Sequence, residues 1–127
     1  MSTKVTQKES EWLTLTGIVN LTDNAGTSMV NRAVDFRGFN FYNGSTTQNA
    51  WIQIFNAKAA DVTLGTTKPM LSFLIGIGAD RTINCSDSPL GNFNNGMSYA
   101  STTTQAGATA ITTGTTGRMF YGDSPLN

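Results

Sequence analysis

The chain has 127 residues, a formal net charge of zero and 13% charged residues, about half the usual share for a soluble domain. This length suits one domain with a modest core. The eight basic side chains stand singly, whereas nucleic-acid binding needs clustered Lys and Arg to neutralise phosphates. No apolar run reaches the roughly 18 residues of a spanning helix. We therefore expect neither a nucleic-acid partner nor a membrane span.

The residue types that carry most catalytic chemistry are scarce. Histidine is absent and Cys85 is the single cysteine, which excludes Ser-His-Asp and Cys-His machinery and an internal disulfide framework. Of the eight carboxylates, only those of Glu9 and Glu11 are close in sequence, and a lone Gly76-x-Gly78-x-Asp80 pattern is a weak metal signal. We expect no enzyme, no metal and no cofactor. Cys85 is expected to be buried.

The N-terminal part contains a polar segment and then an alternating one. Residues 1–11 mix charges with Ser, Thr and Gln and lack the apolar core of a secretory signal, so we expect an N-terminal arm, flexible or ordered by a partner. Folding in a reducing cytoplasm is the expectation. Residues 12–21 alternate with a period of two, which predicts one half-buried strand. Trp12 begins it, as a core residue or an interface anchor.

The longest apolar-rich run is 29–42. Its inward side chains change from even to odd numbers between Phe36 and Phe39, across Arg37-Gly38. A change of parity at a glycine indicates a β-bulge. Asn43-Gly44 then favours a hairpin turn.

Further strands are expected in the second half of the chain. Residues 50–57 are apolar on both faces, which favours a central or interface strand, and a one-turn helix fits at 57–61. The other expected strands span 69–78, with Ile77 pointing inward, 82–85, 97–104 and 108–113. Leu90 and Phe93 are expected to fold back over the core.

The end of the chain holds a basic and aromatic patch, Arg118–Tyr121, between glycines. It anchors a tail either on its own core or on a neighbouring molecule. Short strands and turn signals at these spacings predict an all-β fold, a single antiparallel β-sandwich, jelly-roll-like or immunoglobulin-like. The expected division is an N-terminal arm at 1–11, a sandwich domain at 12–116 and a C-terminal tail at 117–127.

Four segments between Asn49 and Thr104 carry a family pattern in order: Phe55-Asn56-Ala57, Val62–Pro69, Leu71–Gly78 and Phe93–Thr102. Together they resemble a small β-sandwich domain of tailed-bacteriophage virion proteins, over less than half of the chain. The resemblance implies an antiparallel sandwich with a structural role and no catalysis. Members of the family are capsid cement or decoration proteins, or domains of tail and fibre proteins.

A short chain with polar or aromatic segments at both ends is most similar to the cement proteins, which join capsomers through extended termini. The resemblance thus implies a protein on the virion capsid surface that binds the major capsid protein and self-associates into a homo-oligomer. Because aromatic and Arg side chains are the usual anchors, we expect partner contacts at Trp12, Arg118, Phe120 and Tyr121. The alternatives are a tail, baseplate or fibre component contacting host glycans, and a cellular carbohydrate-binding module or small glycosidase.

Overall fold

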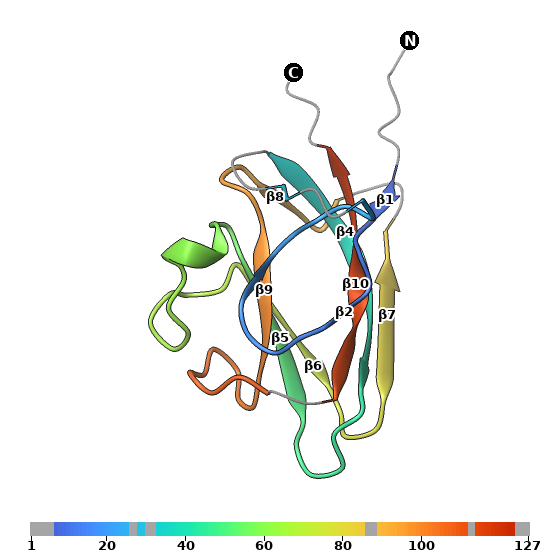
Figure 1. The fold of residues 1–127 in the computed structure, drawn as a ribbon, viewed down its shortest axis with the longest axis vertical. Helices are drawn as coiled ribbons and strands as arrows, with labels where there is room; N and C mark the ends of the chain where they lie inside the picture. Colours follow the sequence, from blue (N-terminus) through green and yellow to red (C-terminus); the bar gives the residue numbers. More distant parts are fainter. Residues whose placement is uncertain (1–6, 26–27, 30–32, 86–88, 112–113, 124–127) are drawn as a thin grey trace.

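The computed structural model describes residues 7–25, 28–29, 33–85, 89–111 and 114–123. They form two antiparallel β-sheets packed face to face, one containing β9, β5 and β6 and the other β10, β4 and β7 (Figure 1). The prediction of an all-β antiparallel sandwich is confirmed.

The first sheet has the order β1-β10-β4-β7, with β2 also paired to β10 and β8 also paired to β4. The second has the order β3-β9-β5-β6, and a short 3-10 helix, η1, follows β5. The strands of the first sheet are β1 Lys8–Glu9, β2 Leu13–Thr14, β4 Val34–Asn43, β7 Asp80–Asn84, β8 Gly91–Phe93 and β10 Thr115–Asp123. Those of the second are β3 Val19–Asn20, β5 Ala50–Phe55, β6 Leu71–Ile75 and β9 Ser98–Thr102, and η1 is Ala59–Asp61.

The strand order is that of a jelly roll. β1 and β2 pair with successive parts of β10, and β7 and β8 with successive parts of β4, so each pair acts as one interrupted strand. The ten strands of the described residues then reduce to eight, which pass between the sheets as two Greek keys. This order decides between the jelly-roll and immunoglobulin alternatives that the sequence left open.

The bulge predicted in the long strand β4 is confirmed. Phe120 of β10 pairs with Gly38 and Tyr121 pairs with Phe36, so Arg37 is the extra residue. Gly38 has a φ of 136°, a backbone region that favours glycine. The extra residue is what keeps the aromatic side chains on both sides of it directed into the core.

Aromatic rings connect the two sheets at the centre of the core. The ring centroid of Phe39 on β4 lies 5.0 Å from that of Phe73 on β6, and Phe41 lies 6.1 Å from Tyr99 on β9. Both contacts are edge-to-face, a geometry that stabilises the core beyond the apolar area that the rings bury. The core also contains Leu15, Leu21, Val34, Phe36, Ile52, Ile54, Ile75, Phe93, Met97, Met119 and Tyr121.

The outer face of the second sheet is also covered. Phe55 and Ala100 form a second apolar cluster with Val62, from the connection after η1. Nearby, the Gln53 amide donates hydrogen bonds to Thr102 Oγ1 at 2.6 Å and to the Gly107 carbonyl at 3.3 Å. Both faces of β5 are therefore buried, as its two apolar faces predicted, and the short helix expected at 57–61 is η1.

Four predictions about element boundaries are wrong. Residues 12–21 form two strands in different sheets, β2 and β3, because the chain crosses between the sheets near Gly17. The tail predicted at 117–127 is, through residue 123, the strand β10, which lies between β1 and β4. Likewise Lys8–Glu9, assigned to the arm, is a strand of the sheet. The last strand is thus 115–123 and not 108–113.

Smaller expectations also need correction. β4 and β5 lie in different sheets, so Asn43-Gly44 begins a crossing loop and not a hairpin. Ile77 is 49% exposed and Leu90 is also exposed, whereas Phe93 is buried as expected. Both exposed residues lie just outside a strand end, where the alternation no longer fixes the side-chain direction.

Candidate functional site

Three of the four predicted contact residues lie together on the outer face of the first sheet. The Arg118 guanidinium carbon lies 5.8 Å from the ring centroid of Trp12 and 5.6 Å from that of Phe120. Arg118 Nη1 also donates a hydrogen bond to Glu9 Oε2 at 2.7 Å. We call these four side chains, Glu9, Trp12, Arg118 and Phe120, the Trp12 platform.

The local strand geometry explains how the platform forms. Arg118 and Phe120 are two residues apart on β10, so their side chains share one face, while Met119 between them points into the core. Glu9 pairs with Phe120 across β1 and β10, which brings its carboxylate beside Arg118. Residues more than 100 positions apart thereby form one cluster.

A backbone lock holds the segment that carries Trp12. The Ser10 amide donates to the Met119 carbonyl and the Met119 amide donates to Ser10 Oγ, both at 2.8 Å. The Ser10 hydroxyl in turn donates to the Glu11 carbonyl. Trp12 is thus fixed two residues from a buried attachment to β10.

The platform presents one large aromatic side chain in a prepared position. Trp12 is 53% exposed, and a guanidinium over an exposed ring is worth about 0.5–1 kcal/mol. The Glu9–Arg118 pair is partly exposed and adds little to stability by itself. The contacts within the platform already restrict the rotamers of Trp12 and Arg118 in the free protein. Less side-chain entropy would therefore be lost if a binding partner covered these two side chains.

The other two predicted contacts lie differently. Tyr121 is fully buried and belongs to the core cluster, so the prediction that it contacts a partner is wrong. The bulge at Arg37 determines this, because Tyr121 pairs opposite Phe36 beyond it. Phe120 is only 5% exposed and supports Arg118 in the platform. Trp12 and the Arg118 guanidinium are therefore the accessible aromatic and cationic groups of the platform.

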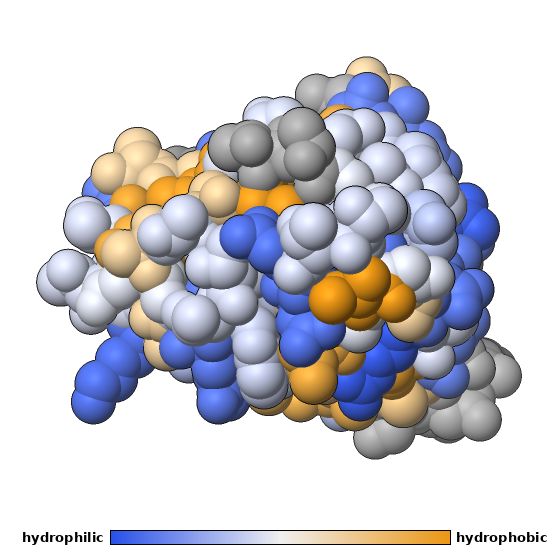
Figure 2. Space-filling model, turned by 90° about the horizontal axis from the view of Figure 1, so that it is seen from below, coloured by the Kyte–Doolittle hydropathy of each residue, from blue (hydrophilic) through white to orange (hydrophobic). Residues whose placement is uncertain are grey.

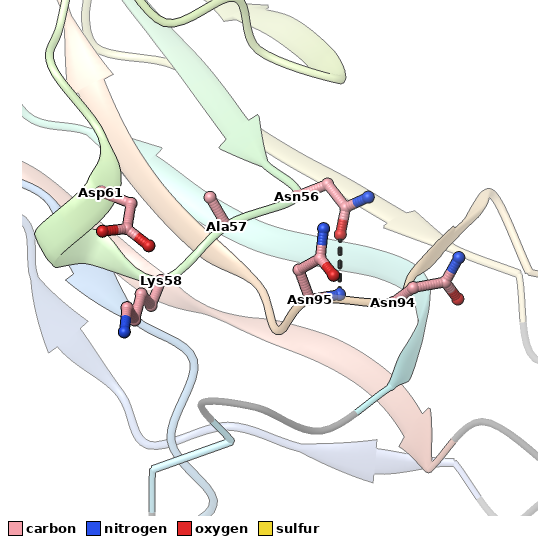
Figure 3. Close-up of a pocket in the computed structure, with 6 residues that line it drawn as sticks. All are labelled: Asn56, Ala57, Lys58, Asp61, Asn94 and Asn95. Atoms are coloured by element: carbon pink, nitrogen blue, oxygen red, sulfur yellow. Dashed lines mark hydrogen bonds between the residues drawn. The ribbon is translucent and has the colours of Figure 1, made fainter.

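A second feature, which the sequence did not indicate, is a polar hollow of about 410 Å³ at one end of the sandwich. Figure 3 shows its lining side chains, which come from the connection after β5 and the turn after β8. They are Asn56, Ala57, Lys58, Asp61, Asn94 and Asn95. We call it the asparagine hollow.

Three hydrogen bonds shape this hollow, one between two of its lining residues and two from other parts of the chain. Asn56 Oδ1 accepts from the Asn95 amide at 3.1 Å, the bond drawn in Figure 3. Asn20 Oδ1 accepts from the Ala59 amide, and Ser98 Oγ donates to the Ala57 carbonyl, each at 2.7 Å. The lining offers amides, one ammonium and one carboxylate, a set suited to hydrogen bonding with a polar ligand.

None of the protein-family models, curated proteins or solved structures compared with the chain matches it.

The resemblance to phage virion domains therefore rests on the quoted segments, and what it implies is a proposal. Those segments include all of β6 and β9 and the end of β5. They also include four of the residues that line the asparagine hollow, Asn56, Ala57, Asn94 and Asn95. In the structure Asn56 follows the end of β5 and the Asn94-Asn95 pair follows the end of β8. Only the jelly-roll topology brings them together, which is why sequence reasoning missed the site.

The remaining exposed apolar side chains are dispersed. Figure 2 shows hydrophobic patches separated by polar residues on the face seen from below. A groove of about 540 Å³ lies where β6 begins, beside Gln105 and Ala106. Among the described residues, the large exposed apolar side chains besides Trp12 are Tyr42, Met70, Leu74, Ile77 and Leu90.

Three further observations concern chemistry. Within the described ranges, no three His, Cys, Asp or Glu side chains lie together as metal ligands would. Cys85 is partly exposed, so the prediction that it is buried is wrong. Burial raises the pKa of the Tyr99 hydroxyl well above its ordinary value; the nearby Ser10 hydroxyl lowers it, and the Glu11 carboxylate raises it.

No helix in the described part of the chain has the length and apolarity to cross a membrane.

Proposed function

We propose that this protein is a non-enzymatic structural protein of a bacteriophage virion, a cement or decoration protein that binds the major capsid protein and stabilises the head. The observation that carries the proposal is the Trp12 platform, in which the half-exposed Trp12 ring packs against Arg118, a residue of strand β10. Trp and Arg are the side chains most enriched among dominant contacts in protein interfaces. The family resemblance adds the identity of the partner.

The fold is consistent with this role. Jelly rolls recur in viral capsid proteins and in lectins, although a fold does not by itself define a function. Zero net charge and few charged residues make close packing of several copies easier, which supports a homo-oligomer on the shell. A protein that binds the assembled shell and not its free subunits shifts the equilibrium towards the shell.

The test is to mix the protein with decoration-free capsids assembled from the major capsid protein of the same phage. We expect the capsids to gain mass and thermal resistance. Trp12→Ala is expected to weaken binding by about tenfold or more, as truncation of a central anchor does. Ile77→Ala is the matched control, because Ile77 is similarly exposed but lies outside the platform. Capsids that gain neither mass nor thermal resistance would refute the proposal.

One observation favours a second candidate, a tail, baseplate or fibre component that contacts host glycans. The asparagine hollow offers amide, ammonium and carboxylate groups that pair well with sugar hydroxyls. A glycan array with the wild type and Asp61→Asn tests it, since a glycan bound in the hollow would lose affinity in the variant. Locating the protein in an intact particle separates shell from tail.

A further inference from the structure

The chain contains two Asn-Gly pairs, Asn43-Gly44 and Asn95-Gly96, in opposite surroundings. An Asn-Gly pair is chemically labile, because the glycine backbone nitrogen can attack the Asn side-chain amide carbon. Glycine lacks a Cβ, so it hinders this approach least and allows the backbone to bend towards it. The local sequence therefore makes both sites reactive, and the fold decides which one reacts.

Burial and hydrogen bonds fix the side chain of Asn43. Its side chain is fully buried, and Nδ2 donates to the Gln48 carbonyl at 2.8 Å and to the Ile75 carbonyl at 3.2 Å. Its Oδ1 accepts from the Ser45 amide at 3.0 Å. The attacking atom is also occupied, because the Gly44 amide donates to the Gly114 carbonyl. Ring closure here must first break these bonds.

Asn95 is exposed in the turn between β8 and β9, at the wall of the asparagine hollow (Figure 3). Its backbone amide donates to Asn56 Oδ1, but within the described part of the chain its side-chain amide forms no hydrogen bond. Gly96 has a φ of 89°, within the range that glycine enters without strain. No side-chain hydrogen bond among the described residues holds the Asn95 carboxamide away from the Gly96 nitrogen, and this carboxamide is exposed to water although Gly96 itself is buried.

We propose that Asn95 is a site of spontaneous deamidation, while Asn43 is protected by the fold. The Gly96 nitrogen forms a bond to Asn95 Cγ and loses its proton, and the Cγ–Nδ2 bond breaks, releasing ammonia. Water then opens the resulting succinimide at either carbonyl, which leaves aspartate or isoaspartate at position 95. No enzyme, metal or oxidant is needed, and the inference does not depend on the proposed function.

The modification changes the asparagine hollow. Lys58 and Asp61 give its lining a balanced formal charge, and a carboxylate at position 95 makes the lining negative. Isoaspartate also inserts one backbone atom just before β9, where the buried Met97 accepts a hydrogen bond from the Leu21 amide through its carbonyl. Deamidation therefore alters both the charge and the shape of the hollow as the protein ages.

Peptide mapping by mass spectrometry tests this on the folded protein, incubated in warm, mildly alkaline buffer. We expect conversion at Asn95, with isoaspartate detectable by enzymatic methylation, and conversion at Asn43 at least about tenfold slower because its amide must first lose its hydrogen bonds. Asn95→Gln is expected to remove the signal, since the longer side chain forms the ring far less readily. An Asn95 rate no higher than that of Asn43 would overturn the proposal.

Denatured protein provides the second measurement. In concentrated urea we expect both Asn-Gly pairs to convert at comparable rates, because the protection of Asn43 is then lost. A difference between the two sites that persists in urea would show that the fold does not set the selectivity, and this too would overturn the proposal.

Discussion

Gly38 packs its backbone directly against the carbonyl of Ile83, so that a Cβ atom on Gly38 would lie 1.8 Å from that oxygen. Ile83 belongs to β7, which pairs with β4 along this stretch and cannot move away without breaking the ladder. The bulge and the close strand contact therefore require glycine for two separate reasons, its φ of 136° and the lack of space.

Gly38→Ala is expected to lower the free energy of unfolding by roughly 3 kcal/mol or more, combining a backbone in a disfavoured region with overpacking. Gly17→Ala and Gly76→Ala are the controls, because nothing lies within 4 Å of a Cβ at either position. They should change stability by less than about 1 kcal/mol. Urea denaturation measures all three, and equal midpoints for Gly38→Ala and the controls would contradict the account.

The sequence predicted this bulge because a change of parity between Phe36 and Phe39 is a local signal. It failed at residues 12–21, where alternation continues although the chain changes sheets. The inward residues before and after Gly17 point to the same core from opposite sides, so the pattern contains no break. Strand order depends on pairing between distant segments, which local periodicity does not encode.

β10 was missed for a different reason. Its inward Met119 and Tyr121 alternate with Arg118 and Phe120, but the glycines at 114, 117 and 122 read as turn signals. The platform was predicted only in part, since Trp12, Arg118 and Phe120 were identified from their chemistry. The role of Glu9 required knowing that residue 9 pairs with residue 120.

The ion pair in the platform should contribute little to stability. A double-mutant cycle with Glu9→Gln and Arg118→Gln is expected to give an interaction free energy below about 1 kcal/mol, because both side chains are partly exposed. The value should fall further in high salt, which screens exposed charges. Thermal unfolding at low and high salt provides the measurement. An interaction of several kcal/mol that is insensitive to salt would instead indicate a buried pair.

Tyr99 should make the fold sensitive to alkali. Burial raises the pKa of its hydroxyl above the ordinary value of 10.0, so above about pH 10 the unfolded chain loses this proton while the folded chain keeps it. The contribution is complete below that pH and is lost as pH rises, by at most about 1.4 kcal/mol per pH unit. Tyr99→Phe should flatten this decline relative to the wild type in urea titrations across the range. Parallel declines in the two proteins would exclude Tyr99 as the cause.

Replacing the asparagine of each Asn-Gly pair by aspartate should change the stability of the fold by very different amounts. Asn43→Asp removes the amide that donates to the Gln48 and Ile75 carbonyls and places a buried oxygen against them. We expect it to lower the free energy of unfolding by about 2 kcal/mol or more, since two acceptors lose their donor and a charge is desolvated. Asn95→Asp keeps the backbone bond to Asn56 and lies at the surface, so its effect should stay within about 0.5 kcal/mol.

Urea denaturation at neutral pH compares the two variants, with Asn43→Ala as a further variant that removes the donor without adding charge. We expect the stability of Asn43→Ala to fall between those of Asn95→Asp and Asn43→Asp, because it leaves the same carbonyls without their donor but does not bury a carboxylate. If Asn43→Asp were as stable as Asn95→Asp, the buried hydrogen bonds of Asn43 would not hold the crossing loop between β4 and β5, and its protection from deamidation would lose its physical basis.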